Sequence, residues 1–270
     1  MKTGVFYQLP CAEFQNAPAR IQETIDQVVY ADSLGFDHAW LAELHFQSEF
    51  SVMSAPLLIA AAIAQKTENI KIGNAVNLIP LHHPIRLAEE IATLDVISNG
   101  RAVFGAGRGS MPAHLEGFGI NSEETRHKFE ESMEIILQSW SDSNVNYKGN
   151  FYDIVDVNVV PKPTQRPHPE IYIAANSQDS FEYASKFDYN ILVTPMIIST
   201  DKVLEGLEFY RNHKSNKNVN GTSHDVTVNA PIYVYNENDS GGLEPIKKSW
   251  SNYVNTLKKI YLSPAAKRAS

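Results

Sequence analysis

Two polar side chains at the end of an apolar stretch are the first candidates for chemistry in this sequence. Glu43 and His45 occur in WLAELHF, two positions apart, so their side chains lie on the same side of an extended chain. At the carboxyl end of a strand, such a pair can face a pocket, where the carboxylate holds the imidazole in one tautomer. The alternative is a polar strand end that only hydrogen-bonds neighbouring loops. The position of Glu43 and His45 at the end of a strand favours a catalytic pair.

A pair of adjacent histidines, His82 and His83, raises the question of a metal site. Adjacent histidines rarely bind one ion together, and the sequence has no H-E-x-x-H motif or facial triad. His83-Pro84 instead predicts the start of a helix with Pro84 in its first turn. We therefore expect no metal.

A glycine-rich turn, GAGRGS at 105–110, surrounds Arg108. In a dinucleotide fingerprint the third glycine enters a helix at once, and an acidic residue follows about 20 positions later. Here Met111-Pro112 follows, and the next clear helix begins only near Asn121. The turn is instead expected to let the backbone approach a planar or anionic ligand, with Arg108 as a fixed cation.

A second candidate for anion binding follows the apolar run at 170–175. Asn176, Ser177 and Ser180 lie where this strand meets a helix, whose free N–H groups and positive dipole end suit a phosphate. Simple capping by Ser177 is the alternative. Arg108 and Arg126 on preceding units favour a phosphate site, because three loops would then converge on one anion.

The composition is that of an ordinary globular domain. The 270 residues are 43% hydrophobic and carry a formal net charge of −8, so no general electrostatic attraction to nucleic acid or an anionic membrane is expected. The single cysteine, Cys11, excludes an internal disulfide and has no evident base partner, so we expect a structural thiol in a reducing compartment. No stretch approaches the roughly 20 apolar residues of a membrane span, and a cytoplasmic protein is predicted.

Apolar runs alternate with amphipathic segments along the chain, which favours a parallel sheet covered by helices. We expect strands at about 4–9, 38–43, 70–76, 102–107, 170–175, 190–195 and 227–234. Helices are expected at about 17–34, 53–66, 83–98, 121–140, 178–187, 200–214 and 245–261.

The alternation predicts one α/β domain over residues 1–270, a TIM-type (β/α) barrel. Seven βα units are counted, and an eighth would need roughly 30 more residues. The segment at about 144–169 carries Gly149 and several prolines, and it reads as an excursion with a small hairpin.

Longer motifs resemble a known family. They are GVFYQLP, WLAELHF, GNAVNLIPLHHPIRLAEEIATLDVISNGR, FGAGRGS, TRHKFEE and YIAANSQDS, in family order from residue 4 to about 195. In these stretches the sequence resembles the bacterial luciferase-like, flavin-dependent monooxygenases. The resemblance implies a luciferase-like barrel that lacks its last βα unit.

The resemblance also implies residue roles. The phosphate of FMN would be held by Arg108, Arg126 and the helix start at Asn176, Ser177 and Ser180. The flavin ring would lie against the end of the third strand, over a non-proline cis peptide at Asn74-Ala75. Glu43 would lie close to the ring.

Three departures from the family pattern stand out. The family often has a histidine pair after the glutamate, and the first histidine of that pair is implicated in catalysis. This chain has Leu44 at that position and keeps only His45, which leaves the identity of the acid–base residue open. Gly107 replaces the reactive thiol that some luciferases carry. The eighth unit is not found.

The resemblance predicts an FMN-dependent monooxygenase that takes reduced flavin from a separate reductase and uses oxygen on a small apolar aldehyde or ketone. The alternatives are a non-catalytic flavin-binding relative, a deazaflavin-dependent oxidoreductase and, more remotely, a metal hydrolase. A dimer is expected, of two copies or with a related subunit, and the helix at 83–98 is the candidate surface.

Overall fold

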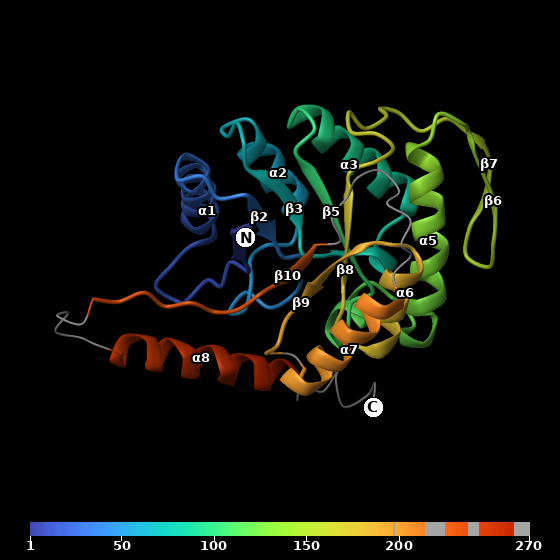
Figure 1. Ribbon diagram of the computed structural model, residues 1–270. Helices are drawn as coiled ribbons and strands as arrows, with labels where there is room; N and C mark the ends of the chain where they lie inside the picture. The colour runs from blue at the N-terminus through green and yellow to red at the C-terminus, as the bar shows by residue number, and fades with distance from the viewer. Residues whose placement is uncertain (197, 214–224, 237–242, 262–270) are drawn as a thin grey trace.

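One curved sheet organises the molecule. The computed structural model describes residues 1–196, 198–213, 225–236 and 243–261. The main sheet has the strand order β1-β2-β3-β5-β8-β9-β10, with β4 also paired to β5, and all of these pairings are parallel. Helices surround the outside of the curl (Figure 1), so the expected TIM-type architecture, incompletely closed, is confirmed.

The strands are Gly4–Tyr7 (β1), His38–Leu41 (β2), Lys71–Asn74 (β3), Asn77–Leu78 (β4), Ala102–Gly107 (β5), Val145–Lys148 (β6), Asp153–Val157 (β7), Glu170–Ala174 (β8), Asn190–Val193 (β9) and Val226–Val228 (β10). The α-helices are Ala17–Ser33 (α1), Pro56–Ala64 (α2), Pro84–Ile97 (α3), Pro112–Gly117 (α4), Thr125–Trp140 (α5), Gln178–Lys186 (α6), Thr200–His213 (α7) and Glu244–Tyr261 (α8). Short 3-10 helices cover Ile79–Leu81 (η1) and Ser122–Glu124 (η2). Lys214, the last residue of one expected helix, lies outside the described residues.

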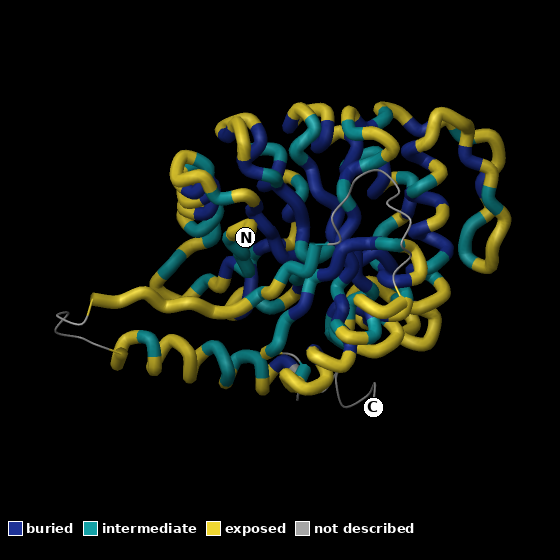
Figure 2. Tube along the Cα trace, in the orientation of Figure 1, coloured by how far each residue is buried: buried dark blue, intermediate teal, exposed yellow. Residues whose placement is uncertain are grey.

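The expected elements differ from the structure mainly at their ends. The strand expected at 227–234 is wrong beyond Val228, because its partner β9 ends at Val193 and the chain there continues into Thr194-Pro195. Residues 230–236 leave the sheet and are exposed (Figure 2). Helix α4 was not expected, although Pro112 in its first turn is a typical start signal. The hairpin expected within 144–169 is confirmed as β6 and β7.

Two apolar cores lie between the sheet and its helices. One joins α1 and α2 to β2 and β3, and the other joins α3, α5, α6 and α7 to β5, β8 and β9. Trp140 is 1% exposed in the second core, its indole N–H donates to the Ala88 carbonyl over 3.0 Å, and its ring meets Phe104 edge to face. This packing fixes α5 against α3 and the central strand β5, which carries the arginine turn.

The two edge strands approach one another at their amino ends. Lys2, just before β1, forms an ion pair of 2.6 Å with Asp225, just before β10. At the opposite end of the strands, α8 lies near the segments that follow β1 and β2. There the Tyr253 hydroxyl donates to Gln8, and the Tyr253 ring packs near Phe50. Among the described helices, none combines the length and apolar character that crossing a membrane requires.

Candidate functional site

Glu43 follows β2 and is held by three donors. It is 4% exposed. Its Oε1 lies 3.1 Å from Nε2 of His45 and 2.7 Å from Nε2 of His82, while Oε2 accepts the Leu78 N–H over 2.8 Å. The expected association of Glu43 with His45 is present in the structure. His82 was expected only beside a helix start, and its contact with Glu43 was missed because the two residues are 39 positions apart.

These contacts set the protonation states of Glu43 and His82. Burial alone would raise the pKa of Glu43, but the hydrogen bonds from His45 and His82, the charge of His82 and the Leu78 N–H together hold it at about 2. Burial lowers the pKa of His82, but the hydrogen bond and charge of Glu43 outweigh burial and raise it above its ordinary value. Glu43 is therefore an anion near neutral pH, and a charge-assisted hydrogen bond joins it to His82.

A second buried histidine, His114 on α4, extends this cluster. Its Nε2 accepts the backbone N–H of His45 over 3.1 Å, and the ring is 3% exposed. Burial, with a smaller effect of His45, lowers the pKa of His114 to about 4. The ring is therefore neutral near pH 7, and the acceptor role of Nε2 places its proton on Nδ1. Sequence reasoning missed His114 because α4 was not expected.

A cavity of about 320 Å³ opens at the carboxyl ends of the strands. It brings together six of the residues expected at the site: Glu43, Arg108, Arg126, Asn176, Ser177 and Ser180. The remaining lining residues are mostly apolar or small and come from the strand ends and from the segments after them: Leu44, Val76, Leu78, Gly107, Gly109, Ser110, Met111, His114, Phe129, Glu130, Ile173, Ala174, Asp179 and Tyr183. His45, Asn74 and Ala75 do not line it.

The expected non-proline cis peptide is shifted by one residue. The non-proline cis peptide is Ala75-Val76, so its assignment to Asn74-Ala75 was wrong. Asn74 is fully buried, and its amide donates to Asn77, which in turn donates to the Gly105 carbonyl. These contacts turn Asn74 into the sheet, and Val76 is the residue of this segment that faces the cavity.

The arginine turn lies at the end of the central strand. Gly107 packs against the Val76 side chain and leaves no room for a Cβ, while Gly109 has φ of +74°, a conformation that favours glycine. Among the described residues, no hydrogen bond or ion pair engages the Arg108 side chain. Its guanidinium is therefore available to an anion in the cavity.

Arg126, at the start of α5, is partly engaged. Its Nε lies 3.2 Å from Glu130 and its Nη1 lies 2.8 Å from Asp179, and all three side chains line the cavity. An anion would compete with these two exposed carboxylates, so Arg108 is the better placed of the two cations.

The loop before α6 completes this end of the cavity. The Ser180 hydroxyl accepts the Ser177 N–H over 3.0 Å and donates to the Ser177 carbonyl over 2.6 Å, as in helix capping. The Oδ1 atom of Asn176 is buried and has no hydrogen-bond partner within the described ranges of the chain. An unpaired acceptor on a cavity wall suits a ligand that brings a hydroxyl donor.

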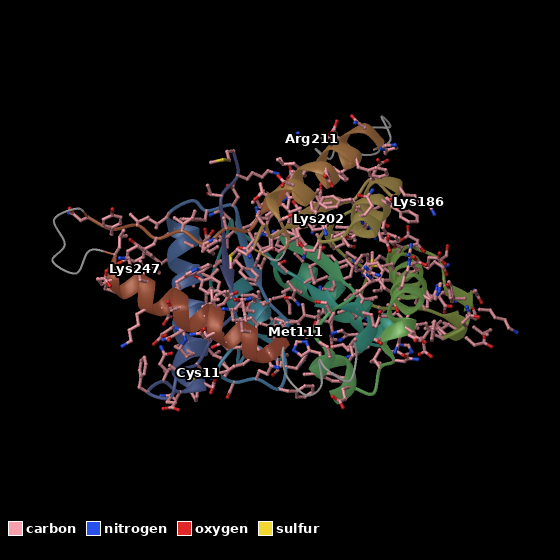
Figure 3. All side chains as sticks on the ribbon, turned by 90° about the horizontal axis from the view of Figure 1, so that it is seen from below. Cys11, Met111, Lys186, Lys202, Arg211 and Lys247 are labelled. Atoms are coloured by element: carbon pink, nitrogen blue, oxygen red, sulfur yellow. The ribbon has the colours of Figure 1, made fainter. Side chains whose placement is uncertain are left out.

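Other sequence candidates lie elsewhere. Cys11 and Met111 are both labelled in Figure 3. Cys11 is on the loop after β1 and does not line the cavity, whereas Met111 does. His83 directly precedes α3, as expected for a helix start. Within the described part of the chain, no three His, Cys, Asp or Glu residues form a group that could hold a metal ion.

Comparisons with known proteins identify relatives of this chain. The family model of luciferase-like monooxygenases matches residues 1–260. The oxygenase component of a flavin-dependent trigonelline monooxygenase from Acinetobacter baylyi is 31% identical over 206 residues, 75% of this chain and 57% of that protein. An F420-dependent glucose-6-phosphate dehydrogenase from Amycolatopsis mediterranei is 29% identical over 197 residues, 69% of this chain and 58% of that protein.

Among solved structures, the monooxygenase RslO1 from Streptomyces bottropensis matches with a TM-score of 0.90 at 26% identity, covering 100% of this chain and 82% of that one. The chain spans about half the length of the curated relatives it matches, between 52% and 57% for three of them. Its relatives include flavin-dependent monooxygenases and F420-dependent oxidoreductases. Because the family model covers nearly the whole sequence, this chain belongs to the luciferase-like monooxygenase family.

Proposed function

We propose that the chain binds FMN in the cavity and acts as a monooxygenase on a small apolar aldehyde or ketone. Reduced FMN, delivered by a separate flavin reductase, would supply two electrons to molecular oxygen; one oxygen atom enters the product and the other leaves as water. The protein's part is to bind the cofactor and substrate, orient them and exclude water from the reacting groups.

The observation that carries this proposal is the convergence of three candidate anion-binding segments on one cavity. Arg108, in the turn after β5, and Arg126, at the start of α5, belong to one βα unit, and the Ser177 loop belongs to the next; all line the same space. Arg108 would anchor a phosphate, and the unpaired Asn176 Oδ1 would accept from a polyol hydroxyl. These residues fit a ligand that carries both a phosphate monoester and hydroxyl groups, as FMN does.

The apolar part of the cavity lining supports the proposed substrate class. Leu44, Met111 and Ile173 give it an apolar lining, which suits a small apolar substrate. Glu43 places a fixed negative charge on the wall, and the neutral His114 ring offers a hydrogen bond. We assign the control of protonation next to the ligand to Glu43, which lines the cavity. His45 lies outside the cavity and hydrogen-bonds the Glu43 carboxylate.

Isotope-labelled oxygen tests this function. The chain, FMN, a flavin reductase and reduced nicotinamide cofactor are incubated with a panel of aldehydes and ketones under ¹⁸O₂. We expect a product that carries one ¹⁸O atom, formed only when chain and FMN are both present. Flavin binding with no labelled product from the panel would instead support the non-catalytic relative.

An F420-dependent oxidoreductase is the second candidate, motivated by the relative of that name at 29% identity. Such an enzyme would transfer hydride to or from its substrate and need no oxygen. Anaerobic turnover with reduced F420, and none with reduced FMN and oxygen, would favour this candidate.

We also infer a dimer and a cytoplasmic location. The exposed side of α3 carries Arg86, Thr93 and Val96, which makes it the candidate contact surface. Light scattering on a size-exclusion column tests this assembly, with Val96→Glu expected to shift the mass toward a monomer.

A further inference from the structure

His82 has no role in the helix that follows it. It lies between η1 and α3, and His83 is the residue that directly precedes α3. The His82 side chain is directed instead to Glu43, with 2.7 Å between Nε2 and Oε1. This separation is shorter than the 3.1 Å between Glu43 and His45, as expected for a charge-assisted contact.

The two partners of this contact have different access to solvent. The side chain of Glu43 is 2% exposed and lines the cavity, whereas that of His82 is 30% exposed and does not line it. Protons can therefore exchange between water and His82 while Glu43 remains enclosed. His82 is placed to pass a change of protonation to the cavity wall without touching a ligand.

We propose that His82 is a positioning residue of the site: as an imidazolium it holds the Glu43 carboxylate in place, and its deprotonation changes the charge of the pair from zero to −1. This rests on the proposed flavin function, because it concerns the binding of an anionic cofactor beside that wall. Below the pKa of His82, the imidazolium balances the negative charge of Glu43. Above that pKa, the Glu43 carboxylate is unbalanced and repels an anionic ligand in the cavity.

Other charged groups around His82 act in known directions. Glu43 and, more weakly, Glu90 on α3 raise the pKa of His82, while burial lowers it. His45 shares Glu43 Oε1, and His114 on α4 contacts His45, through a hydrogen bond from the His45 backbone N–H and an edge-to-face contact of the two rings. Among the described residues, Glu43 therefore provides the largest influence that keeps His82 protonated.

The first test follows the His82 ring by NMR in the protein without flavin. Spectra of His82→Gln identify the resonance, and His213, exposed on α7, is the control. We expect the pKa of His82 above 6.5 in the wild type and below 6.5 in Glu43→Gln, where burial acts without the carboxylate. A wild-type pKa at or below 6.5 would overturn the proposal.

The second test compares the pH dependence of FMN affinity in the wild type, His82→Gln and His213→Gln. The titration of FMN itself is the same with all three proteins. A difference between their pH profiles therefore reports on the substituted histidine. Wild type and His213→Gln should lose about threefold or more in affinity across the His82 pKa, and His82→Gln should lack this component. An unchanged pH profile in His82→Gln contradicts the inference. If no variant binds FMN, the proposed function fails, and the NMR titration still decides the pairing.

Discussion

The backbone of Gly107 lies directly against the Val76 side chain, so that a Cβ at position 107 would overlap Val76 Cγ2. This contact joins the end of β5 to the segment after β3, on the wall of the cavity. It also explains why the position does not carry the thiol of some luciferases: a cysteine would need Val76 to move.

The same contact predicts a specific rescue. Gly107→Ala should destabilise the fold by about 1–3 kcal/mol through overpacking, and Val76→Ala in the same chain should recover part of this loss. Gly105→Ala is the contrasting variant, because its Cβ would overlap the backbone carbonyl of Asn74, which no side-chain truncation removes. Urea unfolding of the single and double variants measures the coupling, and simple additivity at 107 and 76 would contradict it.

Glu43→Gln should lower the free energy of unfolding by about 3 kcal/mol, because it removes the charge that pairs with His82 and His45 inside the protein. Glu205→Gln on the exposed face of α7 is the matched control and should stay within about 0.5 kcal/mol of the wild type. Equal stability of the two variants in urea would show that the buried carboxylate is not paired as described.

Two groups should make the fold sensitive to acid in separate pH ranges. His114 has a pKa of about 4 against an ordinary 6.5, so the unfolded chain binds its proton first and stability falls as pH drops from 6.5 to 4. Allowing for solvent screening, we expect a loss of about 1–2 kcal/mol. Glu43, with a pKa of about 2 against 4.5, adds a loss of about 3 kcal/mol as pH falls from 4.5 to 2.

His82 has the opposite dependence. Because its pKa is raised in the folded state, its contribution is complete below 6.5 and is lost as pH rises through the folded value. Denaturant unfolding at several pH values tests all three groups. His114→Gln should flatten the dependence of the unfolding free energy on pH between 6.5 and 4. An unchanged slope would show that His114 does not cause the loss of stability in this range.

Arg108→Ala should weaken FMN binding by about 10- to 100-fold and leave riboflavin binding nearly unchanged, because only FMN carries the phosphate. Arg86→Ala, on the exposed side of α3 and paired there with Glu90, is the control. Fluorescence titration of both ligands gives the ratio. Equal losses for FMN and riboflavin would mean that Arg108 does not bind the phosphate.

Arg101, beside the amino end of β5, should act on stability alone. Its guanidinium donates to Thr67 Oγ1 and to the carbonyls of Ser98, Ile70, Ala64 and Thr67, a fixed set that a lysine cannot reproduce. Arg101→Lys should therefore cost about 2–3 kcal/mol of unfolding free energy with FMN affinity unchanged. A large loss of FMN affinity in the folded variant would contradict the separation of Arg101, at the amino end of the strands, from the cavity at their carboxyl ends.

Much of the fold followed from local patterns. The βα alternation predicted the order of the main sheet strands, and β5 begins and ends as expected at Ala102 and Gly107. The strand expected at 227–234 failed because its length depends on β9, a neighbour that a single apolar run does not reveal. Helix α4 was missed because PAHLEG is too short to show a period.

The site divided in the same way. Arg108 and Ser177 could be placed together because each follows a strand of the same sheet, and the carboxyl ends of such strands meet, while Arg126 begins the helix α5 that follows β5. The contacts of His82 with Glu43 and of His114 with His45 could not be placed, since His82 follows a 3-10 helix and His114 lies on a short helix. The position of Asn74 outside the cavity lining could not be predicted, because its place at a strand end gave no sign of its hydrogen bond to Asn77.

A crystal structure of the chain with FMN tests the central claim most directly. We expect the phosphate within hydrogen-bonding distance of Arg108 and the Ser177 loop, with the ring in the cavity beside Val76 and Glu43. A flavin bound elsewhere, or bound in this cavity with its phosphate away from Arg108, would contradict the account.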